Sequence, residues 1–242
     1  MRVQEFGSAD APALVLLHGG NVAGWMWGPQ VGAFPEHRVL VPDLPGFGES
    51  NGEDWVSIAT TADAVAALLI ERDVAAADVV GLSLGASVGI ELAVRHPDLV
   101  RRLVLASPTA VPATRRQRIA ARVQLAFWHQ PGYWSATARA WGLPEDDREL
   151  FVRTGLGIRR ETAERIVREV VAGISPALLE RIAAPTLAIA GDRDARTVSR
   201  HSIDLIHERV GGSEVRLIAG AHHAVNLEAP EEFNAAVRAW IS

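Results

Sequence analysis

The sequence contains no cysteine and no lysine, and it has no apolar run long enough to span a membrane. Without cysteine, disulfide bonds, thiolate catalysis and zinc-thiolate sites are excluded. Without lysine, Schiff-base chemistry, Ser-Lys dyads and P-loop phosphate binding are excluded as well. The first ten residues lack the charged-then-apolar pattern of a signal peptide. These absences predict a soluble, cytoplasmic protein with no membrane partner.

The composition fits one sizeable domain, or one domain with an insertion. The chain has 242 residues, of which 48% are hydrophobic, and this is enough for a full core. Its net charge of −5 is too weakly negative to indicate a disordered chain, and it gives no sign of a nucleic-acid partner.

Short apolar runs alternate with helical patterns along most of the chain. The predicted strands are residues 2–6, 13–17, 38–41, 76–80, 102–106, 185–190 and 214–218. The predicted helices are residues 58–71, 86–95, 198–209 and 230–241. This alternation predicts an α/β fold in which helices cover both faces of a mostly parallel central sheet.

The alternation breaks between residues 108 and 183, where the pattern is helical throughout. We expect a helical lid, or cap, inserted between the two core segments 1–107 and 184–242. Twelve arginines and eight acidic residues give the segment a net charge of +4, whereas the rest of the chain carries −9. Two interpretations stay open: a solvated helical surface, or a basic lid that attracts an anionic substrate or an acidic carrier protein.

The most informative motif is the pentapeptide Gly81-Leu82-Ser83-Leu84-Gly85, which lies between a predicted strand and a predicted helix. In a sharp turn of this kind the serine hydroxyl is exposed, and the flanking glycines let strand and helix pack closely. The first amides of the helix favour negative charge beside the serine. The motif is weak by itself, because a glycine-bounded turn can also hold an incidental serine.

A serine nucleophile needs a base, and usually a carboxylate that orients the base. The acid candidates are Asp192 and Asp194 after the strand at 185–190, and the base candidates are His222 and His223 after the last strand. We favour Asp194, because its place further along the turn lets its side chain point back across the strand ends. Two adjacent histidines cannot both face Ser83. The order serine, acid, histidine is the one expected for such a nucleophile turn.

Together these motifs resemble those of the α/β-hydrolase fold superfamily, in its small, lid-bearing, serine esterase-like branch, over nearly the whole chain. The family's His-Gly-x loop with a tryptophan nine positions later matches residues 18–20 and Trp27. Its Asp-x-Pro-Gly-x-Gly-x-Ser loop matches residues 43–50, and its Gly-x-x-Asp turn supports Asp194. The Leu-Glu-x-Pro-Glu-x-Phe motif at 227–233 places His223 on the catalytic position, with His222 where the family usually has glycine.

The resemblance implies a serine hydrolase that cleaves a carboxylic ester or a related acyl compound. Ser83 would form the acyl-enzyme, with His223 as base and Asp194 as acid, and no metal or organic cofactor is implied. The expected partner is a small-molecule ester or acyl substrate, either anionic or carrier-linked in one interpretation of the lid. The backbone amides of Leu84 and Gly20 would form the oxyanion hole.

Two further assignments concern the residues around this site. Asn21 is the alternative to Gly20 in the oxyanion hole, and Trp27 is assigned to packing. Five aromatic residues of the lid are candidates for lining an apolar acyl pocket, with packing of the lid onto the core as the alternative: Phe127, Trp128, Tyr133, Trp134 and Trp141.

Other functions of the same fold stay open as alternatives. Haloalkane dehalogenases and epoxide hydrolases of this fold use an aspartate nucleophile, so Ser83 argues against both, and hydroxynitrile lyases use a lid lysine. Carbon-carbon bond hydrolases usually carry Gly-Pro-Gly where this chain has Gly20-Asn21-Val22. The basic lid and the serine turn also resemble carrier-protein methyl ester esterases. Acyl transfer on the same triad and non-catalytic ligand binding complete the alternatives, and the complete set of triad candidates argues against the latter.

Overall fold

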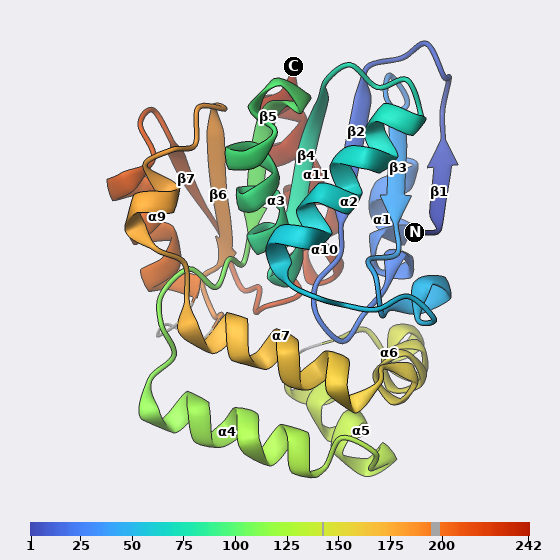
Figure 1. Cartoon of the computed structure of the whole chain (residues 1–242), viewed down its shortest axis with the longest axis vertical. Helices are drawn as coiled ribbons and strands as arrows, with labels where there is room; N and C mark the ends of the chain where they lie inside the picture. The colour runs from blue at the N-terminus through green and yellow to red at the C-terminus, as the bar shows by residue number, and fades with distance from the viewer. Residues whose placement is uncertain (142, 195–198) are drawn as a thin grey trace.

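A seven-stranded sheet forms the centre of the computed structural model, which describes residues 1–141, 143–194 and 199–242 (Figure 1). The strand order is β1-β3-β2-β4-β5-β6-β7. β1 is antiparallel to β3, and every other neighbouring pair is parallel, which confirms the predicted mostly parallel sheet. The strands are β1 Val3–Phe6, β2 Ala13–Leu17, β3 Arg38–Pro42, β4 Ala77–Leu82, β5 Val100–Ala106, β6 Thr186–Gly191 and β7 Glu214–Ile218.

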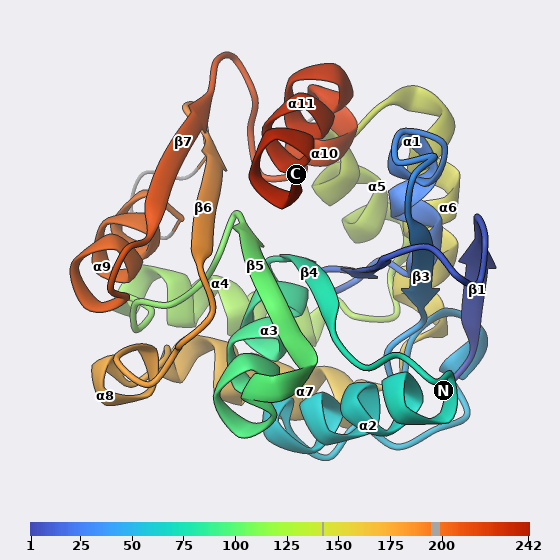
Figure 2. The same ribbon diagram turned by 90° about the horizontal axis from the view of Figure 1, so that it is seen from above.

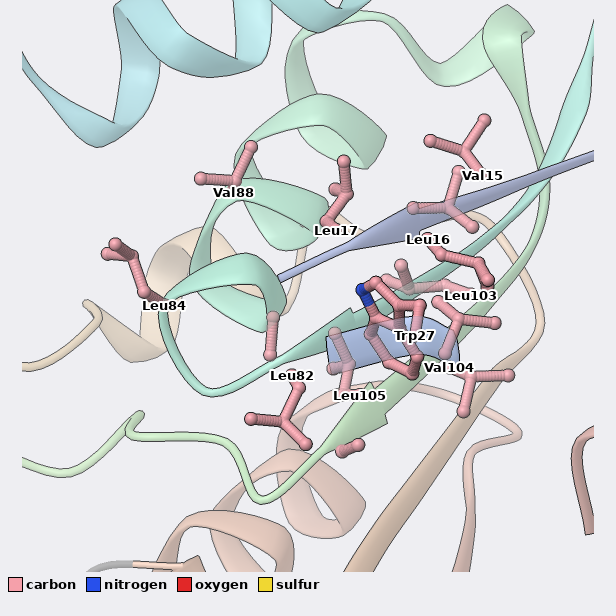
Figure 3. Close-up of a cluster of buried hydrophobic side chains, with 14 of the residues drawn as sticks. Val15, Leu16, Leu17, Trp27, Leu82, Leu84, Val88, Leu103, Val104 and Leu105 are labelled. Atoms are coloured by element: carbon pink, nitrogen blue, oxygen red, sulfur yellow. The ribbon is translucent and has the colours of Figure 1, made fainter. Parts of the chain in front are cut away.

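The burial of each strand follows its position in the sheet. Every residue of β2, β4 and β6 is buried, as expected where helices cover both faces of a parallel sheet. The edge strands β1 and β7 are mostly exposed. The core includes side chains of β2 and β5 and the ring of Trp27 (Figure 3). Trp27 is fully buried and its ring centroid lies 6.1 Å from that of Phe233, in agreement with the packing role assigned to it.

Helices flank the sheet on both sides (Figure 2). On one side lie α2 (Ile58–Glu71) and α3 (Leu84–Arg95), and on the other lie α1 (Gly28–Val31), α10 (Val225–Glu228) and α11 (Pro230–Ile241). α9 (His201–Arg209) packs against β6 and β7. Short 3₁₀ turns occupy Gly24–Trp27, Gly48–Ser50 and Pro97–Leu99.

The described part of residues 108–183 contains five helices: α4 Arg115–Ala126, α5 Pro131–Ala140, α6 Glu145–Gly157, α7 Arg160–Ala172 and α8 Pro176–Leu179. α4, α5, α6 and α7 lie beyond the lower end of the sheet in Figure 1, where β4 ends and α3 begins. Several polar contacts join them to the rest of the chain, and one on α6 and one on α7 serve as examples. The Trp25 indole donates to Thr154 Oγ1 (3.0 Å), and the Glu169 carboxylate accepts from the Ile58 amide (3.1 Å) at the start of α2.

The structure differs from the predicted elements mainly at their ends. The strand predicted at 76–80 continues as β4 to Leu82, because the Ser83 amide still donates to the Ala106 carbonyl of β5 (2.8 Å). The helix predicted at 86–95 begins at Leu84, directly after this contact. The helix predicted at 198–209 corresponds to α9, which extends from His201 to Arg209, and Val198 lies outside the described residues.

Candidate active site

Ser83 lies at a strained turn between β4 and α3. Its backbone has φ 53° and ψ −107°, a left-handed conformation that is costly for a residue with a side chain. A Cβ on Gly81 would lie 2.3 Å from the Gly85 carbonyl oxygen, and one on Gly85 would lie 2.1 Å from the Leu17 carbonyl oxygen. The two glycines are therefore needed for the turn to close against β2, and the serine is held at its apex.

The structure brings His223 and Asp194 together. The Nδ1 atom of His223 lies 3.1 Å from Oδ2 and 3.3 Å from Oδ1 of Asp194. The Asp194 side chain is only 5% exposed and that of His223 is 20% exposed. The loops that carry them pack closely, because a Cβ on Gly191 would lie 2.1 Å from the Ala221 carbonyl oxygen. A carboxylate at Nδ1 holds the proton there, which leaves Nε2 available as a base.

The two rival residues have other partners. Exposed Asp192 accepts a hydrogen bond from the Gly220 amide (2.7 Å), which is a loop-bracing role. His222 pairs through Nδ1 with Glu228 Oε2 (2.8 Å), and its amide donates to the same oxygen (3.0 Å). The sequence analysis missed Glu228 in this role, although the residue belongs to the Leu-Glu-x-Pro-Glu-x-Phe motif.

Ser83 and His223 line the same cavity, which we name the first cavity and which has a volume of about 180 Å³. The two side chains make no direct hydrogen bond in the described structure, and such contacts often tighten only when substrate binds. Among the described residues, the remaining walls are mostly apolar, with Asn21 and Gln124 as the other polar side chains. The walls comprise Gly20, Asn21, Phe47, Leu84, Ala121, Gln124, Trp128, Trp141, Ile158, Ala163, Ile166, Val167, Val170 and Val171.

Backbone amides lie beside Ser83 in this cavity. Leu84 is the first residue of α3, and a Cβ on Gly20 would lie 3.9 Å from the Leu84 Cβ. Within the described ranges, neither the Leu84 nor the Gly20 N–H donates to a protein acceptor. The Asn21 amide also lacks a protein acceptor there, and Asn21 has φ 67°. Unpaired N–H groups next to a nucleophile can stabilise a developing negative charge.

His18 fixes the loop that carries Gly20. The His18 ring is fully buried, and its Nε2 accepts a hydrogen bond from the Leu44 amide (2.9 Å). The ring proton is therefore on Nδ1, which donates to the Gly19 carbonyl (2.8 Å). Burial lowers the pKa of His18, so the neutral ring with this tautomer is the stable form. Asp43 accepts from the Gly24 amide (2.7 Å) and further secures the loop.

Of the five aromatic candidates, Trp128 and Trp141 line the first cavity. The Trp141 ring lies 5.4 Å from the His223 imidazole, centroid to centroid, in an edge-on arrangement. Trp128 is 2% exposed, and its indole N–H donates to the Ile158 carbonyl (2.9 Å). Both rings are therefore held in place beside the candidate catalytic residues.

The other three aromatic candidates lie further away. Tyr133 lines a neighbouring cavity, and its ring stacks against that of Phe127 at 6.4 Å. Phe127 is 50% exposed, whereas Trp134 is fully buried and packs 5.7 Å from Phe151. Neither Phe127 nor Trp134 lines a cavity with Ser83 in the described structure, because one points to solvent and the other is covered by the neighbouring helices. We leave these two out of the proposed substrate pocket.

The neighbouring cavity, which we name the second cavity, is larger, at about 560 Å³, and more polar. It shares His223, Trp141 and Gln124 with the first cavity. Its other polar wall residues are Thr109, Gln117, Tyr133, Arg193, Asp194, Ser199 and His222. The sequence analysis missed Arg193 and Gln124, because the acid turn was searched only for its aspartates and the lid only for its aromatics.

Within residues 1–141, 143–194 and 199–242, no group of three or more histidines, aspartates and glutamates is arranged to hold a metal ion. No helix in these ranges has the length and apolar character that crossing a bilayer requires.

The fold and the serine turn define the class of protein. The model of the "Alpha/beta hydrolase family" matches residues 14–236, and the chain belongs to this family of hydrolases. It is 33% identical over 251 residues to the "Putative carbamate hydrolase RutD" of Serratia proteamaculans, covering 96% of this chain and 91% of the relative. It is 30% identical over 248 residues to the "Pimeloyl-[acyl-carrier protein] methyl ester esterase" of Aeromonas hydrophila, covering 96% and 95%. The crystal structure of a hydrolase from Pseudomonas aeruginosa superposes with a TM-score of 0.85 at 27% identity, covering 99% of this chain and 93% of that one.

Proposed function

We propose that the protein is a serine hydrolase that cleaves carboxylic esters and related acyl compounds through an acyl-enzyme on Ser83. The observation that carries this proposal is the His223–Asp194 pair, whose imidazole lines the same cavity as Ser83. The strained turn supports it, because a left-handed non-glycine residue at a strand end is typical of functional sites.

In the first half of the reaction, Ser83 Oγ attacks the substrate carbonyl carbon and gives its proton to Nε2 of His223. A bond forms between Oγ and the carbonyl carbon, and the carbonyl oxygen takes the negative charge. The amides of Leu84 and Gly20 receive that oxyanion. Asp194 stabilises the imidazolium, and the buried position of its carboxylate strengthens this effect.

The tetrahedral intermediate then collapses and the bond from carbon to the leaving group breaks. The leaving group takes the proton from Nε2, and the acyl group remains on Ser83. A water molecule attacks this ester while His223 accepts its proton. The second collapse returns the proton to Oγ of Ser83 and releases the carboxylic acid, so the enzyme is restored.

We propose that residues 108–183 act as the lid of this site. Ala121 and Gln124 of α4 and Ile166 and Val170 of α7 form walls of the first cavity. A mostly apolar cavity under such a lid excludes water and favours an apolar acyl group. The names of the relatives suggest that carbamates and methyl esters belong in a first substrate panel.

The test is a panel of p-nitrophenyl esters of increasing acyl length, a phenyl carbamate and a methyl ester, run with the wild type and with Ser83→Ala. We expect the substitution to lower kcat by more than about 10⁴-fold on every hydrolysed substrate. Ser87→Ala, one turn further along α3, is the matched control and should change kcat by less than about twofold. Equal activity of Ser83→Ala and wild type would refute the proposed nucleophile.

A further inference from the structure

The two cavities meet at His223, and we propose that they divide the substrate between them. The first cavity holds the acyl group and the second holds the leaving group, where Arg193 selects leaving groups that carry a negative charge. This inference rests on the proposed function, because it assigns the two sides of a bond broken at Ser83.

The assignment of the two sides follows from where each reacting atom must go. The carbonyl oxygen points to the amides of Gly20 and Leu84, which line the first cavity and not the second. The leaving-group atom must instead approach Nε2 of His223, from which it takes its proton. His223 lines both cavities, whereas Ser83 lines only the first of the two. The leaving group therefore extends past the imidazole into the second cavity, and the acyl chain stays in the first.

The walls of the two cavities differ in the chemistry they offer. Apart from its reacting groups, the first cavity presents mostly aliphatic and aromatic side chains, which suit an acyl chain. The second cavity adds the hydroxyl of Tyr133, the amide of Gln117 and the guanidinium of Arg193. Its larger volume, about 560 Å³ against about 180 Å³, also accommodates the larger portion of a substrate.

Arg193 is the only arginine on the described wall of the second cavity. Its backbone is fixed, because its amide donates to the Ala221 carbonyl (2.9 Å). Its guanidinium is exposed and, in the part of the chain that the structure describes, forms no ion pair or hydrogen bond. The one acidic residue on this wall, Asp194, is paired with His223. An arginine left free in this way can bind a carboxylate or a phosphate through two parallel N–H groups.

The substrate class is therefore an ester with an apolar acyl group and an anionic alcohol or thiol portion. The test uses hexanoyl esters that differ only in the alcohol: glycolate, 2-hydroxyethyl phosphate, 2-methoxyethanol and choline. The first two are anionic, the third is neutral and the fourth is cationic. Monoethyl adipate, whose charge lies on the acyl side, completes the set.

For the wild type we expect kcat/KM to be highest for the anionic alcohols and lowest for the choline ester. Arg193→Gln should lower the ratio of kcat/KM for the anionic esters to kcat/KM for the neutral ester roughly tenfold. Arg193→Glu should make the choline ester a better substrate than the anionic esters. The preference should shrink in 0.5 M salt, because the guanidinium is exposed. Arg216→Gln on β7 removes the same charge outside both cavities and should leave the ratio unchanged.

An unchanged ratio in Arg193→Gln would overturn the inference, and so would an Arg193-dependent preference for monoethyl adipate. If Arg193→Gln lowers kcat/KM more for the phosphate ester than for the glycolate ester, the inference is supported and the preferred anion is a phosphate. If Ser83→Ala abolishes hydrolysis while Arg193→Gln keeps the ratio, only the division of the substrate fails. If Ser83→Ala remains active on these esters, the proposed function fails as well.

Discussion

Replacing Asp194 with asparagine keeps the size of the side chain but changes which nitrogen of His223 carries the proton. In the wild type the carboxylate can only accept, so the proton sits on Nδ1, and in the proposed mechanism Nε2 takes the Ser83 proton. An asparagine amide facing Nδ1 donates to it instead. The proton then moves to Nε2, and the imidazole can no longer act as the base.

The size of the effect follows from the burial of this pair. The Asp194 side chain is 5% exposed, so little water can reach this position to stabilise the imidazolium in place of the lost carboxylate. In a Ser-His-Asp triad the same change lowers kcat about 10⁴-fold. This factor corresponds to about 5.4 kcal/mol of activation free energy. We expect Asp194→Asn to lose kcat on this scale while KM changes little.

The assay is steady-state hydrolysis of the best p-nitrophenyl ester, with thermal unfolding measured in parallel to show that the variant is folded. Asp192→Asn is the matched control, because among the described residues the exposed Asp192 carboxylate accepts only from the Gly220 amide, and an asparagine carbonyl can accept the same bond. It should change kcat by less than about twofold. A folded Asp194→Asn variant that keeps more than a tenth of the activity would refute the assigned acid, and an equal loss in Asp192→Asn would point to the other aspartate.

Two further predictions concern the loops that hold the site. Gly85→Ala should reduce the free energy of unfolding by about 3 kcal/mol or more in a urea titration, because the new Cβ would lie 2.1 Å from the Leu17 carbonyl oxygen. Gly132→Ala is the control: a Cβ at Gly132 would meet open space, so this substitution should change the free energy of unfolding by less than about 0.5 kcal/mol. Burial lowers the pKa of His18 in the folded state, so the unfolded chain takes up this proton first, and stability should fall as the pH drops below about 6.5. His18→Asn should show a smaller loss of stability between pH 8 and pH 5.5 than the wild type; an equal or larger loss would contradict the neutral buried ring.

Much of the sheet could be predicted from the sequence because its central strands are uninterrupted apolar runs. The strand at 13–17 and the helix at 58–71 have the predicted bounds. The end of β4 could not be predicted, because it depends on the contact of the Ser83 amide with Ala106 in another strand. Periodicity describes one segment at a time, so it cannot locate an end that a neighbouring strand determines.

The candidate site was only partly predictable, for the same reason. Chain order placed a serine, an acid and a histidine at strand ends, but the residues alone left His222 and His223 open. In the structure His222 pairs with Glu228, whereas His223 pairs with Asp194, and this difference supports the proposal of His223 as the base. The lid aromatics could not be sorted by sequence, since Trp134 and Trp141 differ only in how the lid helices pack around them.

The central claim is that Ser83 is the activated nucleophile, and covalent labelling with a fluorophosphonate tests it most directly. Trypsin releases residues 73–95 as one peptide, which contains only two serines, Ser83 and Ser87. We predict that activity is lost in proportion to one phosphonyl group per chain, and that fragmentation in the mass spectrometer places this group on Ser83. Full labelling of a different residue together with loss of activity, or full activity in a chain labelled at Ser83, would contradict the account.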